Sequence, residues 1–537
     1  MGVDWSSPLV ERGLATIARI PRGEVRESLP RAKAHETLPS PTLTQPQAQL
    51  DLPLGDTTSN ATGVGIPRTQ RLFCNRDLRM TGITWVGFDM DYTLAIYDQP
   101  EMDRLSIEAT QKKLILRGYP SFVTEIPVSV EYPVRGLLID KRLGHVLKMD
   151  RYKVVTKGYH GYKKLSKDEL RALYQSKKLR PATPRYHWID TLYALSEVAL
   201  YAALVEAYER RELTLDYARL FTDIRESIDE AHRDGTILDA VLGDLPRYVK
   251  RDPELASTLH KLRSAGKRLF LLTNSRWPYT ERMMEYLLGG SMSEYPSWKN
   301  FFDVVVVAAK KPAFFQERRP LLEVMGNESR PATFPLERGR VYEGGSLHDL
   351  ERAFGVTGDQ ILYVGDHIYG DILRSKKESA WRTAMIIQEL EQEMRAYEAC
   401  TDDFARAAAL EDQREHLEND LRFYQARFKE LSRGKASNGV TPANEAERQR
   451  VKRAVERVRG LLRQVETELE SIETRSDERF HPFWGSLLKE ANEQSSFGDQ
   501  VEEYACVYTS RVSNFLVYSP QQHYRSPRDV MAHEIGT

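Results

Sequence analysis

Two aspartates, Asp89 and Asp91, stand at the end of a short apolar run in the stretch GFDMDYTLAIY, residues 87–97. Burying a carboxylate is costly unless the group is paired or takes part in chemistry. Side chains two residues apart on a strand point the same way, so both carboxylates can face one small ligand. Two reactions use such a pair, namely glycoside hydrolysis and phosphoryl transfer.

Polar residues also end three further apolar runs, at 268–275, 302–311 and 361–366. They are Thr273, Asn274, Ser275, Lys311, Asp366 and the nearby Asp371. Hydroxyl and amide donors beside a lysine suit a phosphate, and carboxylates suit a hard cation such as Mg²⁺. A sugar oxocarbenium ion gains nothing from a lysine, so the set predicts phosphoryl transfer, with the residues at 273–275 as phosphate ligands.

In the predicted mechanism, Asp89 attacks phosphorus and forms an aspartyl-phosphate, which splits one difficult step into two. Asp91 protonates the leaving oxygen and then removes a proton from the attacking water. Mg²⁺, held by Asp89, Asp366 and the backbone carbonyl of Asp91, offsets the repulsion between carboxylate and phosphate. Lys311 stabilises charge on the transferred group. Asp371 is either a further metal ligand or a residue that holds Lys311 or a metal-bound water.

Continuous apolar runs of this kind are typical of parallel strands buried on both faces, and helix-like segments alternate with them. The alternation predicts an α/β fold with a doubly wound parallel sheet, in which ligands bind beyond the carboxyl ends of the strands. All four polar ends are then expected to meet at one edge. About 170 residues separate the first two runs, too many for one crossover, and they predict an inserted, mostly helical cap domain.

The predicted parts of the chain are a tail (1–66), a catalytic core (67–100 and 250–400), a cap that binds substrate (101–249), a helical hairpin (401–480) and a segment packing on the core (481–537). The tail is rich in Pro, Ser, Thr and Gln and is expected to be disordered. Heptad spacing on both sides of a turn-rich loop predicts the hairpin, a short coiled coil.

The bulk composition narrows the function classes. The chain has 77 basic and 78 acidic residues in 537, and this balance argues against a nucleic-acid partner. Its three cysteines lie far apart, which predicts neither a disulfide framework nor a zinc site and fits a cytoplasmic protein. The sequence has no apolar run of membrane-spanning length, so no membrane partner is expected.

The motifs together resemble a known family. DMDYTL, LLTNS, the lysine of AKKP and GDHIYGD resemble, in this order, the four motifs of the haloacid dehalogenase superfamily. Longer stretches, among them RGLLIDKRLGHVLKMDR, KKPAFF and VYEGGS, are similar to the cytosolic purine 5′-nucleotidase family, and the resemblance covers about residues 68–535. It implies a haloacid dehalogenase-like core and a Mg²⁺-dependent 5′-nucleotidase that acts on purine nucleoside monophosphates.

The resemblance also implies residues that bind the base. FTDIRESIDEAH resembles the cap helix that reaches it, so Arg225, Asp229 and His232 carry over, and Tyr193 takes the place of a stacking aromatic. Asp229 can accept a hydrogen bond from N1–H of hypoxanthine or guanine, which adenine lacks, so IMP and GMP are the expected substrates. Leu238 stands at about the place where family members can carry a lysine.

A nucleotide effector site near the fourth motif is a further implication, with contacts expected at Arg180, Asp190, Tyr369 and Lys377. Asp190 and Glu503 make this region less favourable for a polyphosphate. The family tends to oligomerise, so a homo-oligomer is expected. Two alternative functions stay open: a nucleoside phosphotransferase, in which a nucleoside captures the aspartyl-phosphate, and a non-catalytic nucleotide-sensing or scaffold protein.

Overall fold

A ten-stranded sheet runs through the part of the chain that the computed structural model describes, which is residues 65–175, 179–326, 328–373, 375, 378–438 and 442–527. The predicted tail falls outside these residues except for its last two positions. In spatial order the strands are β1 (Phe73–Cys74), β20 (Val507–Thr509), β17 (Arg382–Ile386), β16 (Ile361–Gly365), β3 (Trp85–Phe88), β11 (Arg268–Leu272), β12 (Val304–Val307), β15 (Val341–Gly344), β13 (Leu321–Met325) and β14 (Glu328–Pro331).

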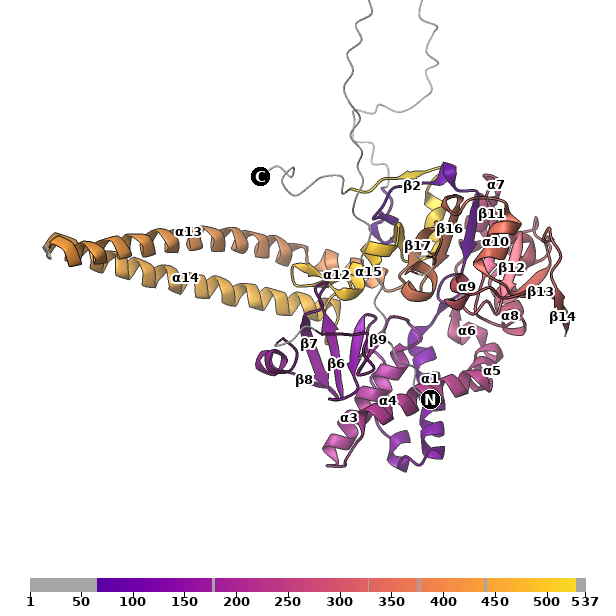
Figure 1. Ribbon diagram of the computed structural model, residues 1–537, viewed down its shortest axis with the longest axis horizontal. Coiled ribbons are helices and arrows are strands. Elements are labelled where there is room, and N and C mark those ends of the chain that lie inside the picture. The colour runs from indigo at the N-terminus through magenta and orange to yellow at the C-terminus, as the bar shows by residue number, and fades with distance from the viewer. Residues whose placement is uncertain are drawn as a thin grey trace, which may run out of the picture. The chain divides into compact units, whose positions relative to one another are not determined.

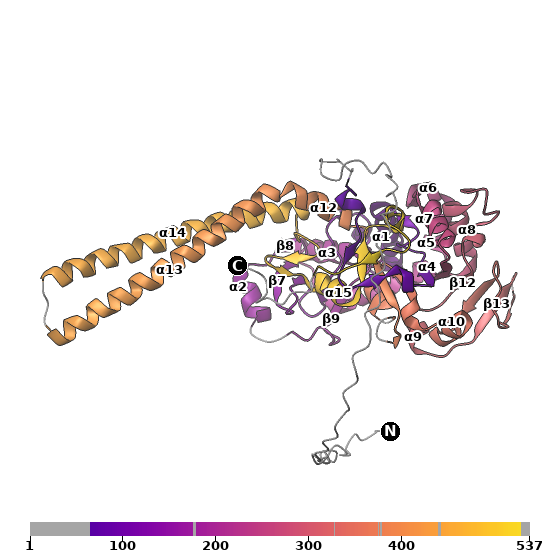
Figure 2. The same ribbon diagram turned by 90° about the horizontal axis from the view of Figure 1, so that it is seen from above.

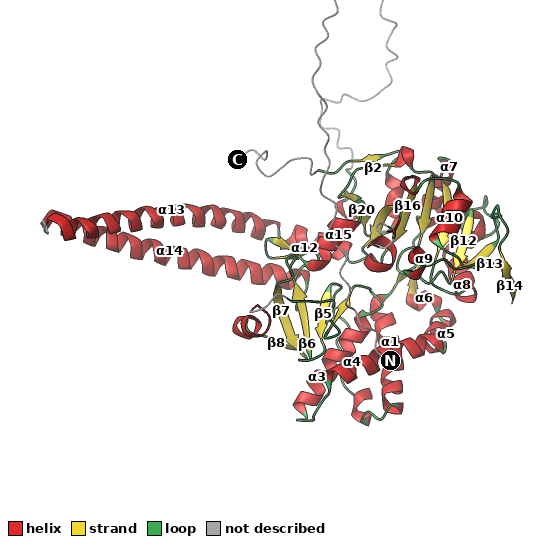
Figure 3. Cartoon of the chain, viewed as in Figure 1, coloured by secondary structure: helices red, strands yellow, loops and turns green. Residues whose placement is uncertain are grey.

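The strands from β20 to β15 in this order are parallel, and antiparallel strands close both edges (Figure 3). Every residue of β3, β12 and β16 is buried, as a sheet covered on both faces requires. Neighbouring residues of one strand enter different apolar clusters. Leu269 and Leu271 pack in one cluster and Phe270 and Leu272 in another, because alternate side chains point to opposite faces. The predicted doubly wound α/β fold is confirmed.

The four predicted strands are neighbours in this sheet, in the order β16, β3, β11, β12. From β3 the chain adds β11, β12 and β15 on one side and then returns to place β16 on the other side. Ligands in such sheets bind at the carboxyl ends of the strands where the order reverses. Each of these strands ends before its apolar run does, because the last polar residues of the run have left the sheet. The helices of this region are α7 (Leu255–Ser264), α8 (Trp277–Leu288), α9 (Ala313–Gln316), α10 (Leu347–Phe354), α12 (Leu390–Ala399) and α15 (Ser496–Tyr504).

The insertion between β3 and β11 holds the predicted helices and, in addition, a five-stranded antiparallel sheet that the sequence analysis did not predict. Its helices are α1 (Gln99–Leu116), α2 (Lys167–Leu170), α3 (Leu195–Arg210), α4 (Tyr217–Arg233), α5 (Thr236–Gly243) and α6 (Leu245–Tyr248). Its strands, in spatial order, are β8 (Lys163–Lys164), β7 (Val155–His160), β6 (His145–Met149), β5 (Leu137–Asp140) and β9 (Tyr186–Ile189). The inner strands β5 and β6 are buried throughout, so they lack the alternation that marks a half-exposed strand.

Short strand pairs join distant segments. Strand β4 pairs with β10 and so ties the two ends of the insertion together beside the main sheet. The pairs that do so are β4 (Ile96–Tyr97) with β10 (Val249–Lys250) and β2 (Leu78–Arg79) with β21 (His523–Tyr524), whereas β18 (Lys489–Glu490) and β19 (Glu493–Gln494) form a local hairpin.

Two long helices, α13 (Thr401–Asn438) and α14 (Pro442–Phe480), lie side by side along their length (Figures 1 and 2). Their apolar seam contains residues at the predicted heptad positions, namely Leu410, Leu417, Val458, Val465 and Ile472. The predicted helical hairpin is confirmed. Among the described residues, no helix combines the length and apolar character needed to cross a membrane.

Candidate active site

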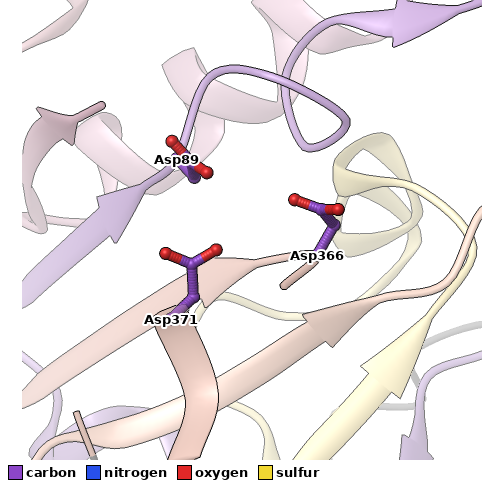
Figure 4. A group of neighbouring side chains, drawn as sticks. All are labelled: Asp89, Asp366 and Asp371. Carbon is purple, nitrogen blue, oxygen red and sulfur yellow. The ribbon is translucent and has the colours of Figure 1, made fainter. Parts of the chain in front are cut away.

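Three carboxylates meet at the carboxyl ends of the central strands. Asp89 follows β3, Asp366 follows β16, and Asp371 lies in the short π-helix Ile368–Leu373 that comes next. One oxygen from each lies within 4.8 Å of the others, and all three residues are buried (Figure 4). Gly365 permits this approach, because a Cβ atom there would lie 2.7 Å from the Cβ of Asp371.

Lys311 bridges two of these carboxylates. Its Nζ lies 2.9 Å from Asp89 Oδ1 and 2.7 Å from Asp371 Oδ1, and it donates to the hydroxyl of Tyr363 at 2.8 Å. Burial disfavours the ammonium, but the charges of Asp371 and Asp89 outweigh it and raise the pKa of Lys311 above its usual value. The lysine therefore stays charged.

Lys311 alone does not supply enough positive charge to balance the three carboxylates. Burial raises the pKa of Asp89 well above its usual value, against the opposing charge of Lys311. Burial and then the charge of Asp371 raise the pKa of Asp366 to about 7, while Arg135 acts in the opposite direction. A buried set of oxygen donors with excess negative charge fits a hard divalent cation such as Mg²⁺.

Asp91 has a different environment. Its Oδ1 accepts a hydrogen bond from the hydroxyl of Tyr97 and its Oδ2 accepts one from Ser275 Oγ, both at 2.6 Å. Tyr97 is itself bonded to the hydroxyl of Tyr279 at 2.8 Å. Burial raises the pKa of Asp91, although the hydrogen bonds from Ser275 and Tyr97 oppose the rise. These contacts fix both oxygens of Asp91, while the carboxylates of Asp89, Asp366 and Asp371 form a separate group.

The three predicted phosphate ligands after β11 have different surroundings. Asn274 holds the backbone of Lys311, because its Oδ1 accepts from Lys311 N at 2.6 Å and its Nδ2 donates to Lys311 O at 3.0 Å. Ser275 holds Asp91, as described above. Thr273 is fully buried, and its Oγ1 accepts from the backbone N–H of Ser275 at 3.1 Å. The side chains of Asn274 and Ser275 thus position catalytic candidates, a role that strand-end position alone did not indicate.

The predicted base-binding residues lie on the insertion. Tyr193 precedes α3 and His232 lies at the end of α4, and their rings meet edge to face with centroids 4.6 Å apart. Burial lowers the pKa of His232 to about 4, so its ring is neutral at physiological pH. The two predicted base-binding rings are therefore in contact with each other.

Arg225 and Asp229 lie one turn apart on α4 and line a hollow of about 250 Å³ together with His187. Arg225 Nη1 lies 3.0 Å from His187 Nε2, and its Nε lies 3.4 Å from Glu197 Oε2. Asp229 is exposed. The structure thus brings the predicted base-binding residues to one region of the cap, with Arg225 turned toward His187 and Glu197.

Sequence reasoning missed several residues that contact the site or its cap, among them Tyr363 and the four described next. Glu197 and His187 contact Arg225. Tyr97 donates a hydrogen bond to Asp91, and the hydroxyl of Tyr279 contacts that of Tyr97. Glu197 is buried, its Oε2 has no hydrogen-bond partner among the described residues, and burial raises its pKa to about 7. A glutamate in a helix usually lies on the solvated face, so the sequence gives no local signal that Glu197 is buried beside Arg225.

The predicted effector contacts are only partly described. Asp190 Oδ2 lies 3.7 Å from Nε2 of His367 in the fourth motif, and Arg180 and Tyr369 are exposed. Burial lowers the pKa of His367, but its contact with Asp190 and the negative charges of Asp190, Asp371 and Asp366 together outweigh burial, so the net shift is upward. Lys377 lies outside the described residues.

Comparisons with known proteins extend over most of the chain. Residues 72–536 match the model of the 5′ nucleotidase family. A 5′-nucleotidase domain-containing protein of Dictyostelium discoideum is 27% identical over 476 residues, which are 87% of this chain and 75% of that protein. The 5′-nucleotidase domain-containing protein 2 of Homo sapiens is 30% identical over 342 residues, or 60% of this chain. This matched region spans 64% of the human protein's own length.

Solved structures also align with the chain, at low scores. A predicted phosphoglycolate phosphatase from Haemophilus somnus 129pt aligns with 57% of this chain and 86% of its own, with 15% identity and a TM-score of 0.25. L-2-haloacid dehalogenase from Xanthobacter autotrophicus aligns with 57% of this chain and 78% of its own, with 14% identity and a TM-score of 0.20.

Proposed function

The chain belongs to the 5′ nucleotidase family, a family of phosphoric monoester hydrolases, and from this premise we propose that it hydrolyses purine nucleoside 5′-monophosphates through an aspartyl-phosphate. The observation that carries the proposal is the bridge from Lys311 to Asp89 and Asp371, beside Asp366. This arrangement supplies a nucleophilic carboxylate, a fixed cation for the phosphoryl oxygens and donors for a divalent cation in one buried site.

In the first step Asp89 attacks phosphorus, a bond forms between its carboxylate oxygen and phosphorus, and the bond to the 5′-oxygen breaks. Asp91 gives its proton to that leaving oxygen, and its raised pKa favours the protonated form that this requires. In the second step Asp91 takes a proton from water, which attacks phosphorus and releases Asp89. Mg²⁺, held by Asp89, Asp366 and the Asp91 carbonyl, with Asp371 as a ligand or as the anchor of Lys311, would reduce the repulsion between carboxylate and phosphate.

Phosphate release from a panel of monophosphates, with and without EDTA, tests this proposal. The expected result is turnover of IMP and GMP ahead of pyrimidine nucleotides and sugar phosphates, lost in EDTA and restored by excess Mg²⁺. An assay with added inosine distinguishes transfer from hydrolysis, since a phosphotransferase would convert the nucleoside into a new monophosphate. Failure to hydrolyse any phosphomonoester would contradict the proposal and favour a nucleotide-sensing or scaffold protein.

The base preference gives a second prediction, for Asp229→Ala. Asp229 is proposed to accept from N1–H of hypoxanthine or guanine, and a hydrogen bond to a charged group is worth about 1.5–3 kcal/mol. We therefore expect kcat/KM for IMP and GMP to fall by about 10-fold to 100-fold, and that for AMP to fall much less.

Glu226→Ala is the matched control for Asp229→Ala, because Glu226 is an exposed carboxylate on the same helix that lines the same hollow. This control variant should keep the ratio of IMP to AMP turnover. If Asp229→Ala instead reduces all three activities equally, Asp229 supports the cap and does not distinguish the bases.

We also propose a cellular location, a nucleotide effector and an oligomeric state. We place the protein in the cytoplasm, which is supported by the free thiols of Cys74, Cys400 and Cys506. A nucleotide effector is proposed near Asp190 and His367, and activity that stays flat across millimolar ATP would remove it. A homo-oligomer is proposed from the family resemblance, and sedimentation of the full chain would measure it.

A further inference from the structure

A buried arginine of the insertion contacts the backbone of Asp366 in the candidate active site. Arg135 precedes β5, within the stretch RGLLID, and its exposed fraction is 1%. Its Nη1 donates to the backbone carbonyl oxygen of Asp366 at 3.0 Å. Its Nε and Nη2 donate to the two carboxylate oxygens of Glu389, at 2.7 Å and 2.6 Å, and its guanidinium lies 4.9 Å from the ring centre of Phe497.

This geometry restrains Asp366 in a way that its own strand does not. Asp366 follows the last residue of β16, so the sheet no longer fixes its peptide group. A planar guanidinium that is held at two nitrogens along one edge by Glu389 has little freedom, and its third nitrogen, Nη1, sets the position of the Asp366 carbonyl. The carbonyl and the side chain share one Cα atom, so this contact also limits where the carboxylate can point.

We propose that Arg135 is a positioning residue of the metal site, which holds Asp366 in the orientation that a divalent cation requires and is itself held by Glu389. The proposal rests on the proposed function, because it takes Asp366 as a metal ligand. Partners that orient metal ligands typically change metal affinity by about 10-fold to 100-fold when they are removed. Arg135 touches neither substrate nor metal in this arrangement and acts only through Asp366.

A purely structural role is the alternative, because Arg135 also joins the insertion to the segment before α12. The chain offers a matched control in Arg263, whose Nη1 donates to the carbonyl of Phe301 at 3.1 Å and to Asp303 Oδ2 at 2.6 Å. Asp303 directly precedes β12, so this pair lies at the amino ends of the strands, opposite the candidate active site. Arg135→Met and Arg263→Met therefore remove the same two kinds of contact, at opposite edges of the sheet.

The experiment measures Mg²⁺ binding to the full chain by titration calorimetry, beside unfolding by denaturant in EDTA. We expect both variants to lose stability, but only Arg135→Met to bind Mg²⁺ about 10-fold to 100-fold more weakly than the unmodified protein. Arg135→Lys should not restore the affinity, because one ammonium group cannot bond both Glu389 oxygens and the Asp366 carbonyl in this geometry. Unchanged Mg²⁺ affinity in Arg135→Met would overturn the inference.

Two further outcomes bear on the role of Arg135: a variant that does not fold, and an unmodified protein that binds no Mg²⁺. If Arg135→Met does not fold, Glu389→Gln replaces it, since this variant keeps the guanidinium but removes its charged partner. A smaller weakening of Mg²⁺ binding in Glu389→Gln supports the inference, and unchanged binding overturns it. If the unmodified protein itself binds no Mg²⁺, the proposed metal site fails and this inference falls with it. Binding that is normal in both proteins removes only the role of Arg135.

Discussion

Replacing Asp89 with asparagine is expected to reduce phosphate release from IMP by at least about 10⁴-fold, the scale on which loss of a nucleophile acts. An amide has the shape of the carboxylate but not its negative charge, so it cannot form the aspartyl-phosphate. The fold should survive, because Lys311 keeps its contact with Asp371 at 2.7 Å after losing the one with Asp89. The measurement is single-turnover and steady-state phosphate release at saturating Mg²⁺.

Asp359→Asn is the control for Asp89→Asn, since Asp359 is an exposed aspartate just before β16, at the end of the strand remote from the site. That variant should keep full activity. Acid-quenched samples of the unmodified protein should carry phosphate on the peptide that contains Asp89. Phosphate release by Asp89→Asn at the rate of the unmodified protein would contradict the assignment of Asp89 as the nucleophile.

Replacing Lys311 with methionine is expected to have the second-largest effect. The loss of one preorganised donor to the developing charge typically costs about 10²-fold to 10³-fold in kcat. Removing one partner of a buried ion pair also costs about 3–5 kcal/mol of unfolding free energy, because Asp89 and Asp371 then face each other without their shared cation. Steady-state turnover and denaturant unfolding in EDTA measure the two effects.

Mg²⁺ should restore more stability to Lys311→Met than to the unmodified protein. A divalent cation among Asp89, Asp366 and Asp371 offsets the same negative charge that the lysine offsets when the metal is absent. Lys310→Met serves as the control, because Lys310 is the exposed neighbour of Lys311, and it should change neither stability nor turnover. Equal Mg²⁺-dependent stabilisation of Lys311→Met and the unmodified protein would show that the ion does not bind among these carboxylates.

Sequence patterns predicted the catalytic half of the molecule because its signals are local. Each central strand is a continuous apolar run, and a polar residue ends it where the chain leaves the sheet. The rule that parallel strands carry ligands at their carboxyl ends then places Asp89, Asp366 and Lys311 together without any knowledge of loop conformations. The family match over residues 72–536 confirms the resemblance that these motifs indicated.

Contacts between distant segments were not predictable in this way. Tyr97 and Tyr279 are 182 residues apart in sequence, yet their hydroxyls lie 2.8 Å apart and one of them bonds Asp91. The five-stranded sheet of the insertion was missed because its strands β5 and β6 are buried throughout and have no alternation, and the pairing of strands is itself a long-range contact.

By itself, therefore, the sequence determined which polar residues end the central strands, the helical hairpin and the kind of chemistry. These features depend on periodicity and residue type. Only the tertiary structure decided which polar groups contact and hold one another at the candidate site. Asn274 and Ser275 are turned toward Lys311 and Asp91, and Arg135 crosses from the insertion to Asp366. A side chain's role depends on the direction of its few hydrogen bonds, and that direction is set by neighbours that folding brings from far along the chain.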